Sequence, residues 1–308
     1  MVANLTQTLS LLITANHILD YYSVVTGYGH ISVRNPLNNS TFFMTGNGVP
    51  PALVRSPADI DEFNLQDASP TSDSTSQRNE DMGPSSTSER FIHQGLLKRF
   101  PSVQSVVHSH SRAVIPFGIG GVPFQPTYHL AGGFIGQSAP PFPSRGQEGE
   151  EAPVFEIADY YTPNDTQNLL VNKPRFGQAL ANTFLTPAHN ATTPDDVPAA
   201  PDYNLVLQRG HGFTTTGASI PQAVYRAVYT TWNAEVQTTA ITINDAAAPN
   251  RGVRYIAQRE LADTAAVDAG AYTRDWMLWA AQVGVNPLYA NDLGDAAIPE
   301  PMTSVTKR

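Results

Sequence analysis

The chain has 308 residues and not one cysteine. Without cysteine there are no disulfide bonds, no thiolate nucleophile and no zinc–thiolate site. A bound metal would therefore need histidine, aspartate or glutamate as ligands. The lack of cysteine leaves the compartment open, because such a chain fits reducing and oxidising surroundings alike.

Positive charge is also scarce. The 18 basic residues include only three lysines, and with 27 acidic residues they give a net charge of −9. No cluster of basic residues stands out, so we expect no nucleic-acid partner. The acidic balance does little to attract anions from a distance, so any anion-binding site must be built locally.

Long apolar runs are missing as well. None approaches the roughly 18 residues that a membrane-spanning helix needs, so we expect no membrane partner. The N-terminus lacks a basic segment, and the apolar run at residues 11–13 is too short for a signal peptide, which predicts a cytoplasmic protein. Secretion after removal of a signal is a second interpretation. It is supported by Asn-x-Ser/Thr sequons at Asn4, Asn38, Asn39, Asn164 and Asn190.

Hydrophobic residues make up 41% of the chain, which is ample for one large core. Their spacing predicts helices over residues 5–22, 88–100, 176–184, 220–243 and 261–283, and strands over residues 30–34, 41–45 and 102–107. The polar stretch 67–88 is interpreted as a surface loop. No internal repeat or clean domain boundary is visible, which favours one α/β domain with a C-terminal extension.

Three histidines carry the strongest chemical signal. His108 and His110 follow a valine-rich strand, where alternate side chains point to the same face. His211 lies between two glycines, which let the backbone approach another group closely. The alternative is that these imidazoles are merely buried and hydrogen-bonded, but burying several of them without partners is costly. Three imidazoles with one open position are typical of a catalytic metal centre.

Other candidate site residues carry weaker signals. Glu89, in the first turn of a predicted helix, is either stabilised by the helix N-terminus or acts as a fourth ligand or a general acid/base. His93 shares a helix face with Glu89 and is interpreted as a packing residue or a residue behind the site. For Tyr128 and His129 three roles stay open: surface residues, residues that support the site, or residues that contact the substrate.

Five segments together resemble the class II aldolase/adducin family, which includes L-fuculose-1-phosphate aldolases, an epimerase and several decarboxylases. In chain order between about residues 12 and 237 they are Gly-His-Ile-Ser-Val-Arg, Met-Thr-Gly-Asn-Gly-Val-Pro, Ser-Glu-Arg-Phe-Ile-His, Val-Val-His-Ser-His-Ser and Arg-Gly-His-Gly. The resemblance implies a three-layer α/β/α fold with a central, largely antiparallel sheet flanked by helices. It also implies a homo-oligomer, usually a tetramer.

The resemblance also implies roles for individual residues. His108, His110 and His211 match the metal ligands, and Glu89 matches the carboxylate that ligates the ion or moves a proton beside it. The family's phosphate pocket maps onto Gly29, His30, Asn47, Gly48, Thr87 and Ser88. Zinc is the first expectation for the divalent metal, with manganese, cobalt or iron as alternatives. We expect residues 1–245 to form the family domain and residues 246–308 to form a helical extension packed on it.

Two positions depart from the sugar-phosphate aldolases. His30 stands where they usually have asparagine, and Asn47 where they have serine or threonine. The Gly-His-Ile-Ser-Val-Arg form, the segment Tyr128-His129-Leu-Ala-Gly and the Trp-x-x-Trp…Asn-Pro-Leu-Tyr tail resemble the branch that includes aromatic-acid decarboxylases. The altered pocket favours a small unphosphorylated hydroxy- or oxo-acid, or a sugar-like substrate, over a sugar phosphate. The expected activity is therefore a metal-dependent carbon–carbon lyase, either an aldolase or a decarboxylase. Alternatives are an epimerase, a non-haem iron oxygenase acting on an aromatic acid, or a binding protein like adducin.

Overall fold

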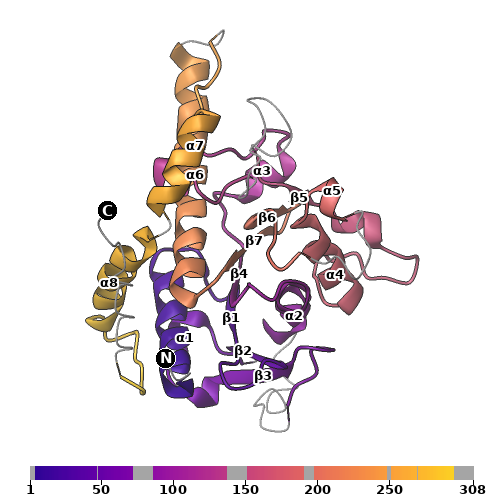
Figure 1. Ribbon diagram of the computed structural model, residues 1–308, viewed down its shortest axis with the longest axis vertical. Helices are drawn as coiled ribbons and strands as arrows, with labels where there is room; N and C mark the ends of the chain where they lie inside the picture. Colours follow the sequence, from indigo (N-terminus) through magenta and orange to yellow (C-terminus); the bar gives the residue numbers. More distant parts are fainter. Residues whose placement is uncertain are drawn as a thin grey trace, which may run out of the picture.

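The computed structural model describes residues 4–46, 48–71, 86–136, 151–190, 198–247, 251–268 and 270–294. A seven-stranded sheet with the order β3-β2-β1-β4-β7-β6-β5 forms its centre (Figure 1). The strands are β1 His30–Arg34, β2 Thr41–Thr45, β3 Ile60–Asn64, β4 Ser105–Ser109, β5 Val154–Phe155, β6 Leu205–Gln208 and β7 Gly212–Gly217. All neighbouring pairs are antiparallel except β5 with β6, so the predicted largely antiparallel sheet is confirmed.

Helices cover both faces of the sheet. They are α1 Leu5–Tyr21, α2 Arg90–Arg99, α3 Ile115–Ile119, α4 Pro174–Thr183, α5 Pro187–Asn190, α6 Ile220–Ala247, α7 Gln258–Asp268 and α8 Ala271–Gly284. Helices α1 and α6 cover one face, with α8 packed outside them, and α2 and α4 cover the other (Figure 1). Each face has its own hydrophobic cluster. The predicted three-layer α/β/α architecture is confirmed.

The C-terminal part differs from the sequence expectation. The single helix expected over residues 261–283 is two helices, α7 and α8, and α8 begins after Gly270. Glycine is a poor helix former because its backbone loses the most conformational entropy when it is fixed in a helix. The expected domain boundary at residue 245 falls inside α6, so that division stays a prediction. Most of the expected loop 67–88 lies outside the described residues.

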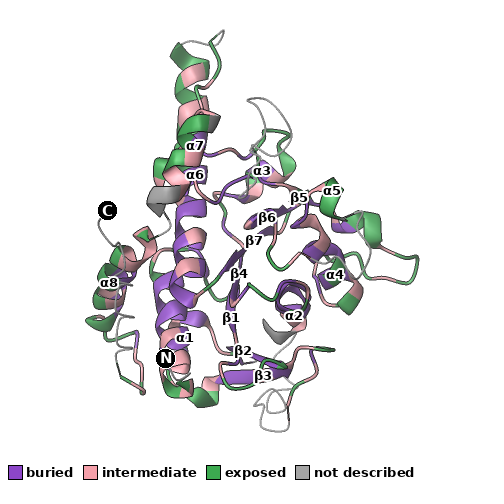
Figure 2. Cartoon of the chain, in the orientation of Figure 1, coloured by how far each residue is buried: buried purple, intermediate pink, exposed green. Residues whose placement is uncertain are grey.

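Helix α6 changes character along its length. Its first part, up to Gln237, contributes most of its buried residues, whereas the rest projects from the body of the molecule (Figure 2). Near this transition Asn233 accepts hydrogen bonds from the backbone N–H groups of Thr127 and Tyr128 and donates one to Gln125 O. These bonds hold the irregular segment before Tyr128 against α6.

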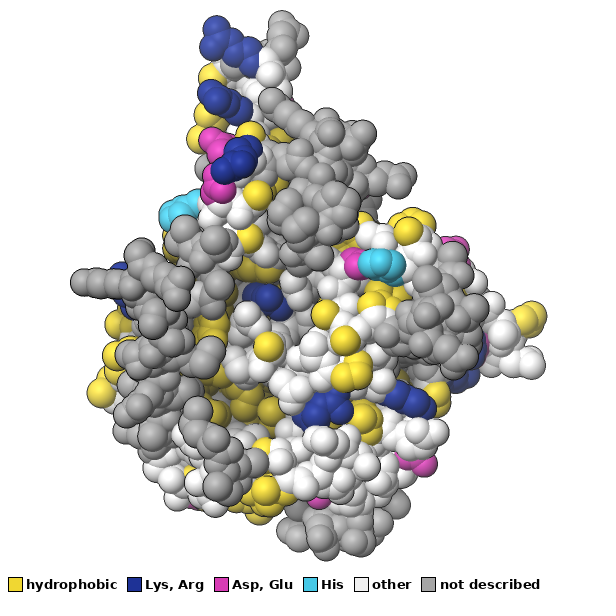
Figure 3. All heavy atoms as spheres, viewed as in Figure 1, with side chains coloured by type: hydrophobic (Ala, Val, Ile, Leu, Met, Phe, Trp, Pro, Cys, Tyr) yellow, Lys and Arg dark blue, Asp and Glu magenta, His cyan; other side chains and the backbone are white. Residues whose placement is uncertain are grey.

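Two surface features bear on possible partners. On the face of the molecule seen in Figure 3, lysine and arginine side chains lie at several separate places and form no single basic patch. Of the helices within the described ranges, none combines the length and apolar character that crossing a bilayer requires.

A glycine contact holds α2 against α4. A Cβ atom on Gly177 would lie 2.1 Å from Phe91 O, and one on Gly95 would lie 2.4 Å from Gly177 O. The two backbones therefore touch where no side chain fits, and this contact fixes the helix that follows Glu89 in the chain.

We expect Gly177→Ala to lower the free energy of unfolding by about 1–3 kcal/mol, because overpacking forces the helices apart. Gly270→Ala is the matched control, since a Cβ there meets nothing within 4 Å; we expect it to change the stability by less than about 0.5 kcal/mol. Urea unfolding of both variants measures the difference. Equal stabilities would show that α2 and α4 can separate without cost.

Candidate metal centre

The sheet brings the three histidines to one place. His108 is in β4 and His110 follows the strand directly, while His211 lies in the turn between β6 and β7. Strand β7 pairs with β4, with Phe213 opposite Ser109, so the turn lies beside the end of β4. Residues about 100 positions apart in the chain thereby become neighbours.

Glycines make the close approach of His211 possible. Gly210 and Gly212 have φ values of +64° and +148°, which residues with a side chain rarely adopt. A Cβ atom on Gly212 would lie 1.9 Å from Ser109 O. The expected reason for a glycine beside His211, close contact of the backbone with another group, therefore applies, and that group is the backbone of β4.

Glu89 completes the cluster from the N-terminal end of α2. Its Oε2 lies 3.5 Å from His211 Nε2, 3.6 Å from His108 Nε2 and 3.8 Å from His110 Nε2. The centroids of the three imidazole rings are 4.7–4.8 Å apart. One ligand atom from each of the four residues lies within 4.8 Å of all the others, a spacing that a single ion could bridge.

The state of the imidazole nitrogens tests whether a cation fits. His108 Nδ1 lies 3.0 Å from Phe213 O; donation of its N–H to this carbonyl turns the Nε2 lone pair towards the cluster. Within the described residues, the buried Nε2 atoms of His108, His110 and His211 have no hydrogen-bond partner. Buried polar atoms without partners are costly, and a divalent cation would satisfy all three. Three imidazoles and a carboxylate suit zinc, manganese, cobalt or iron.

Burial sets the charges in the cluster. It lowers the pKa of His108 well below its usual value, which favours the form of the ring whose lone pair can bind a cation. Burial alone would raise the pKa of the Glu89 carboxyl, but the surrounding imidazoles lower this pKa well below its usual value. Glu89 is therefore a buried carboxylate facing three nitrogen ligands.

A second histidine pair lies behind the cluster. His30 is opposite His108 in the β1–β4 pairing, and its Nε2 is 4.0 Å from Glu89 Oε2. His30 Nδ1 is 2.7 Å from His93 Nε2, and His93 Nδ1 is 2.6 Å from Ser32 Oγ. Burial lowers the pKa of His30 to about 4. The position of His93 behind the site agrees with its spacing of four residues from Glu89.

Of the other residues expected around the substrate, some lie within the described residues and some do not. Gly29, with φ +89°, lies against β4, since a Cβ there would be 3.1 Å from His108 O. Ser88 is half-buried and directly precedes Glu89. Gly48 lies in the loop after β2. Asn47 and the side chain of Thr87 are outside the described residues.

Tyr128 and His129 lie in a different setting. The Tyr128 ring contacts His129 and, on α6, Tyr229, with centroids 5.4 and 5.5 Å apart. The fold thus packs Tyr128 against α6, with His129 beside it. The role of both residues at the substrate stays a prediction.

Among the four cluster residues, His110 is the most exposed. The side chain of His110 is 31% exposed, against 10% for His211, 6% for Glu89 and none for His108. His110 lines a cavity of about 370 Å³ whose wall also contains Tyr28 and Arg112. The sequence reasoning missed Tyr28 and Arg112, although each lies within two residues of a predicted site residue. Of the four cluster residues, His110 alone lines this cavity.

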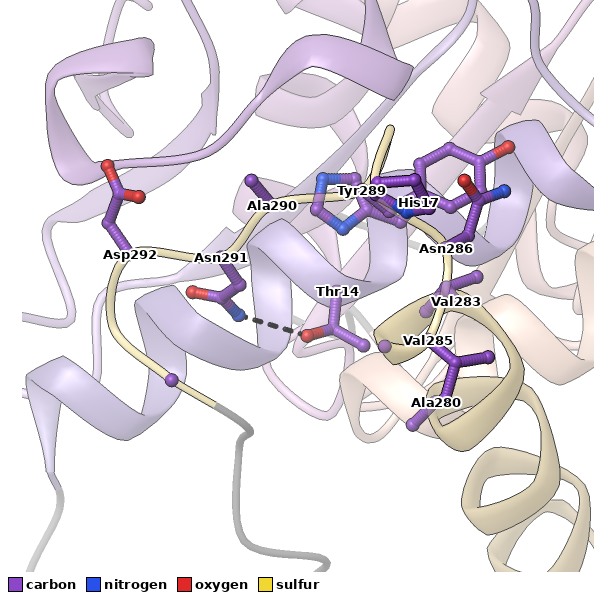
Figure 4. A pocket seen from close by; sticks show the side chains of 13 residues that line it. Thr14, His17, Ala280, Val283, Val285, Asn286, Tyr289, Ala290, Asn291 and Asp292 are labelled. Atoms are coloured by element: carbon purple, nitrogen blue, oxygen red, sulfur yellow. Dashed lines mark hydrogen bonds between the residues drawn. The ribbon is translucent and has the colours of Figure 1, made fainter.

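A larger cavity, of about 490 Å³, lies between α1 and the chain after α8 (Figure 4). There His17 stacks on Tyr289, and Asn291 donates a hydrogen bond to Thr14 over 3.1 Å. None of the four cluster residues lines this cavity. Cavity volume alone would therefore not identify the candidate metal centre.

Comparisons with known proteins agree with this architecture. Residues 10–238 match the class II aldolase and adducin N-terminal domain, so the chain belongs to the class II aldolase/adducin family. The chain is 36% identical over 283 residues to the decarboxylase tropJ of Talaromyces stipitatus, covering 91% of this chain and 95% of that protein. The family and this relative support a carbon–carbon lyase and confirm the predicted likeness to the decarboxylase branch.

Solved structures show the same fold. L-fuculose 1-phosphate aldolase from Glaciozyma antarctica superposes with a TM-score of 0.61 at 17% identity, covering 91% of both chains. An aldolase II superfamily protein from Pseudomonas syringae also gives 0.61, at 15% identity, covering 90% of this chain and 92% of that one.

Proposed function

We propose that the protein is a divalent-metal-dependent decarboxylase acting on a small, unphosphorylated hydroxy- or oxo-acid. The observation that carries the proposal is the cluster of Glu89, His108, His110 and His211, whose inward-facing nitrogens lack partners within the described residues and which opens on the His110 side. The identity to a named decarboxylase over almost the whole chain favours loss of carbon dioxide over aldol cleavage.

His108, His110 and His211 would hold the ion, with Glu89 beside them. Such an ion supplies Lewis acidity for the negative charge that develops when a carbon–carbon bond breaks. The bond to the substrate carboxylate breaks, carbon dioxide leaves without the bonding electron pair, and the remaining carbon takes a proton. Glu89 is ionised before turnover, so this carboxylate would first take a proton from the substrate's hydroxyl group or from water and then deliver it to that carbon. Its Oε2 faces the three ligand nitrogens and is placed for this transfer.

The substrate's anionic group would lie near His30. The resemblance implies asparagine at this position in the sugar-phosphate aldolases, and the change to His30 favours a carboxylate over a phosphate. Arg112 and Tyr28, in the wall of the cavity beside His110, would meet a substrate on its way in. Together these residues favour a compact organic acid.

Metal analysis and a substrate screen test this function. Protein purified without chelator is expected to contain about one zinc or similar ion per chain and to release carbon dioxide from hydroxy- or oxo-acids. Chelator should reduce the rate at least about 100-fold, and added metal should restore it. L-fuculose 1-phosphate serves as the contrasting substrate and should yield no aldehyde.

Three outcomes would contradict the proposal. Protein without bound metal that keeps its full rate would exclude metal dependence. Aldehyde release from the sugar phosphate would favour an aldolase. Turnover that stops without oxygen and consumes it with Fe(II) would favour the oxygenase alternative.

A further inference from the structure

His30, His93 and Ser32 form a continuous chain of side-chain contacts behind the candidate metal centre. The His30 Nδ1–His93 Nε2 distance is 2.7 Å and the His93 Nδ1–Ser32 Oγ distance is 2.6 Å. All three residues are buried, with 3%, 0% and 0% exposure. Because these contacts are buried from solvent, each is a hydrogen bond with a defined direction.

The Ser32 hydroxyl sets that direction. Within the described residues, His93 Nδ1 is the only partner found for Ser32 Oγ, while the Ser32 carbonyl separately accepts from Ser105 Oγ. If His93 donated to Ser32, the buried hydroxyl proton would have no acceptor, which is costly. Ser32 therefore donates to His93 Nδ1, His93 Nε2–H donates to His30 Nδ1, and His30 keeps its own proton on Nε2.

The surroundings of His30 Nε2, at the other end of this series of hydrogen bonds, agree with this direction. His30 Nε2 lies 4.0 Å from the Glu89 carboxylate. An N–H dipole pointing towards a carboxylate is attracted, whereas a lone pair there would be repelled. At 4.0 Å the contact is longer than a hydrogen bond, so the N–H stays available to another acceptor in the site.

We propose that His93 and Ser32 are positioning residues that hold His30 as a neutral N–H donor to the anionic group of the substrate. This inference rests on the proposed function for the presence of such a group. Because the donor is neutral, it recognises the anion without adding a buried positive charge beside the metal ligands. An asparagine at this position would need no such chain of hydrogen bonds, because its amide always carries N–H donors.

Nuclear magnetic resonance tests the direction of the chain without any substrate. In zinc-loaded protein with ¹⁵N-labelled histidine, we expect the His30 signals, assigned from their loss in His30→Asn, to show a proton on Nε2 and none on Nδ1. Ser32→Ala should remove the preference for this tautomer, and Ser32→Thr should keep it. A proton on His30 Nδ1 in the unsubstituted protein would overturn the proposal, whatever the enzyme does.

A double-mutant cycle tests the positioning role. The probe is 2-hydroxybenzoate, whose affinity for the zinc-loaded protein is measured by calorimetry. His93→Phe should weaken binding about tenfold, whereas His93→Gln, which keeps an N–H donor, should recover most of the affinity. In the His30→Asn background, His93→Phe should change the affinity less than about twofold.

The control is His17→Gln, a buried histidine whose Nε2 is 2.6 Å from Val54 O, away from the cluster. It is expected to lower the melting temperature and leave probe affinity unchanged. Equal losses from His93→Phe in both backgrounds would show a general structural role and overturn the positioning role. Zinc-loaded protein that shows the expected tautomer but does not bind the probe would refute the proposed substrate class and leave the hydrogen-bond direction standing.

Discussion

Replacing His108 by alanine is expected to abolish both metal binding and activity. The ring is fully buried, its Nδ1 is held by Phe213 O, and its Nε2 faces the cluster. Alanine at this position would leave two imidazoles and one carboxylate as possible ligands. We expect the metal content to fall from about one ion per chain to a small fraction of that, and the rate to fall at least about 10³-fold.

Metal content and thermal unfolding with and without added zinc measure this effect. Wild-type protein should gain about 2.7 kcal/mol of stability when zinc is present at about 100 times its dissociation constant, and His108→Ala should gain little. His189→Ala is the matched control, since His189 pairs with Asp202 and is not one of the four cluster residues. A double variant, His108→Ala with His211→Ala, that still bound a full complement of zinc would show that the ion lies elsewhere.

The convergence of the three histidines could be expected from the sequence because each signal is local. The spacing of His108 and His110 places both side chains on one side of a strand, and the glycines beside His211 indicate a tight backbone approach. The order of these segments along the chain also identifies the family and hence the sheet. What local spacing does not contain is the strand order that places the turn at His211 beside β4.

The pairing of His30 with His93 illustrates what could not be predicted. The two residues are 63 positions apart, and their contact depends on the register of β1 against β4 and on how closely α2 packs. That packing depends in turn on the contact between Gly95 and Gly177. The cavity beside Tyr28 and Arg112 could not be predicted either, because it depends on which of the candidate metal ligands the fold leaves exposed. Both features depend on packing between residues far apart in the sequence, which local residue patterns do not reveal.

Glu89→Gln is expected to separate proton transfer from metal binding. Glutamine has nearly the same shape, and its amide oxygen can still accept the hydrogen bond that Val171 N–H donates to Glu89 Oε1 over 3.1 Å. The three imidazoles remain, so we expect the variant to keep most of its metal. The amide cannot take up and deliver a proton, so kcat should fall about 10²–10⁴-fold with little change in KM.

The comparison of metal content with kcat decides between the two roles of Glu89. Retained metal with a large loss of kcat would support proton transfer, whereas loss of the metal would make the carboxylate a required ligand. Glu156→Gln is the matched control, because Glu156 is partly exposed and pairs with Arg209, and neither residue is among the four in the cluster. Because the surrounding imidazoles lower the pKa of the Glu89 carboxyl, it stays ionised throughout the neutral range, and no loss of wild-type rate between pH 6 and 8 should trace to its protonation. A variant that kept both metal and full kcat would show that Glu89 neither binds the ion nor moves the proton.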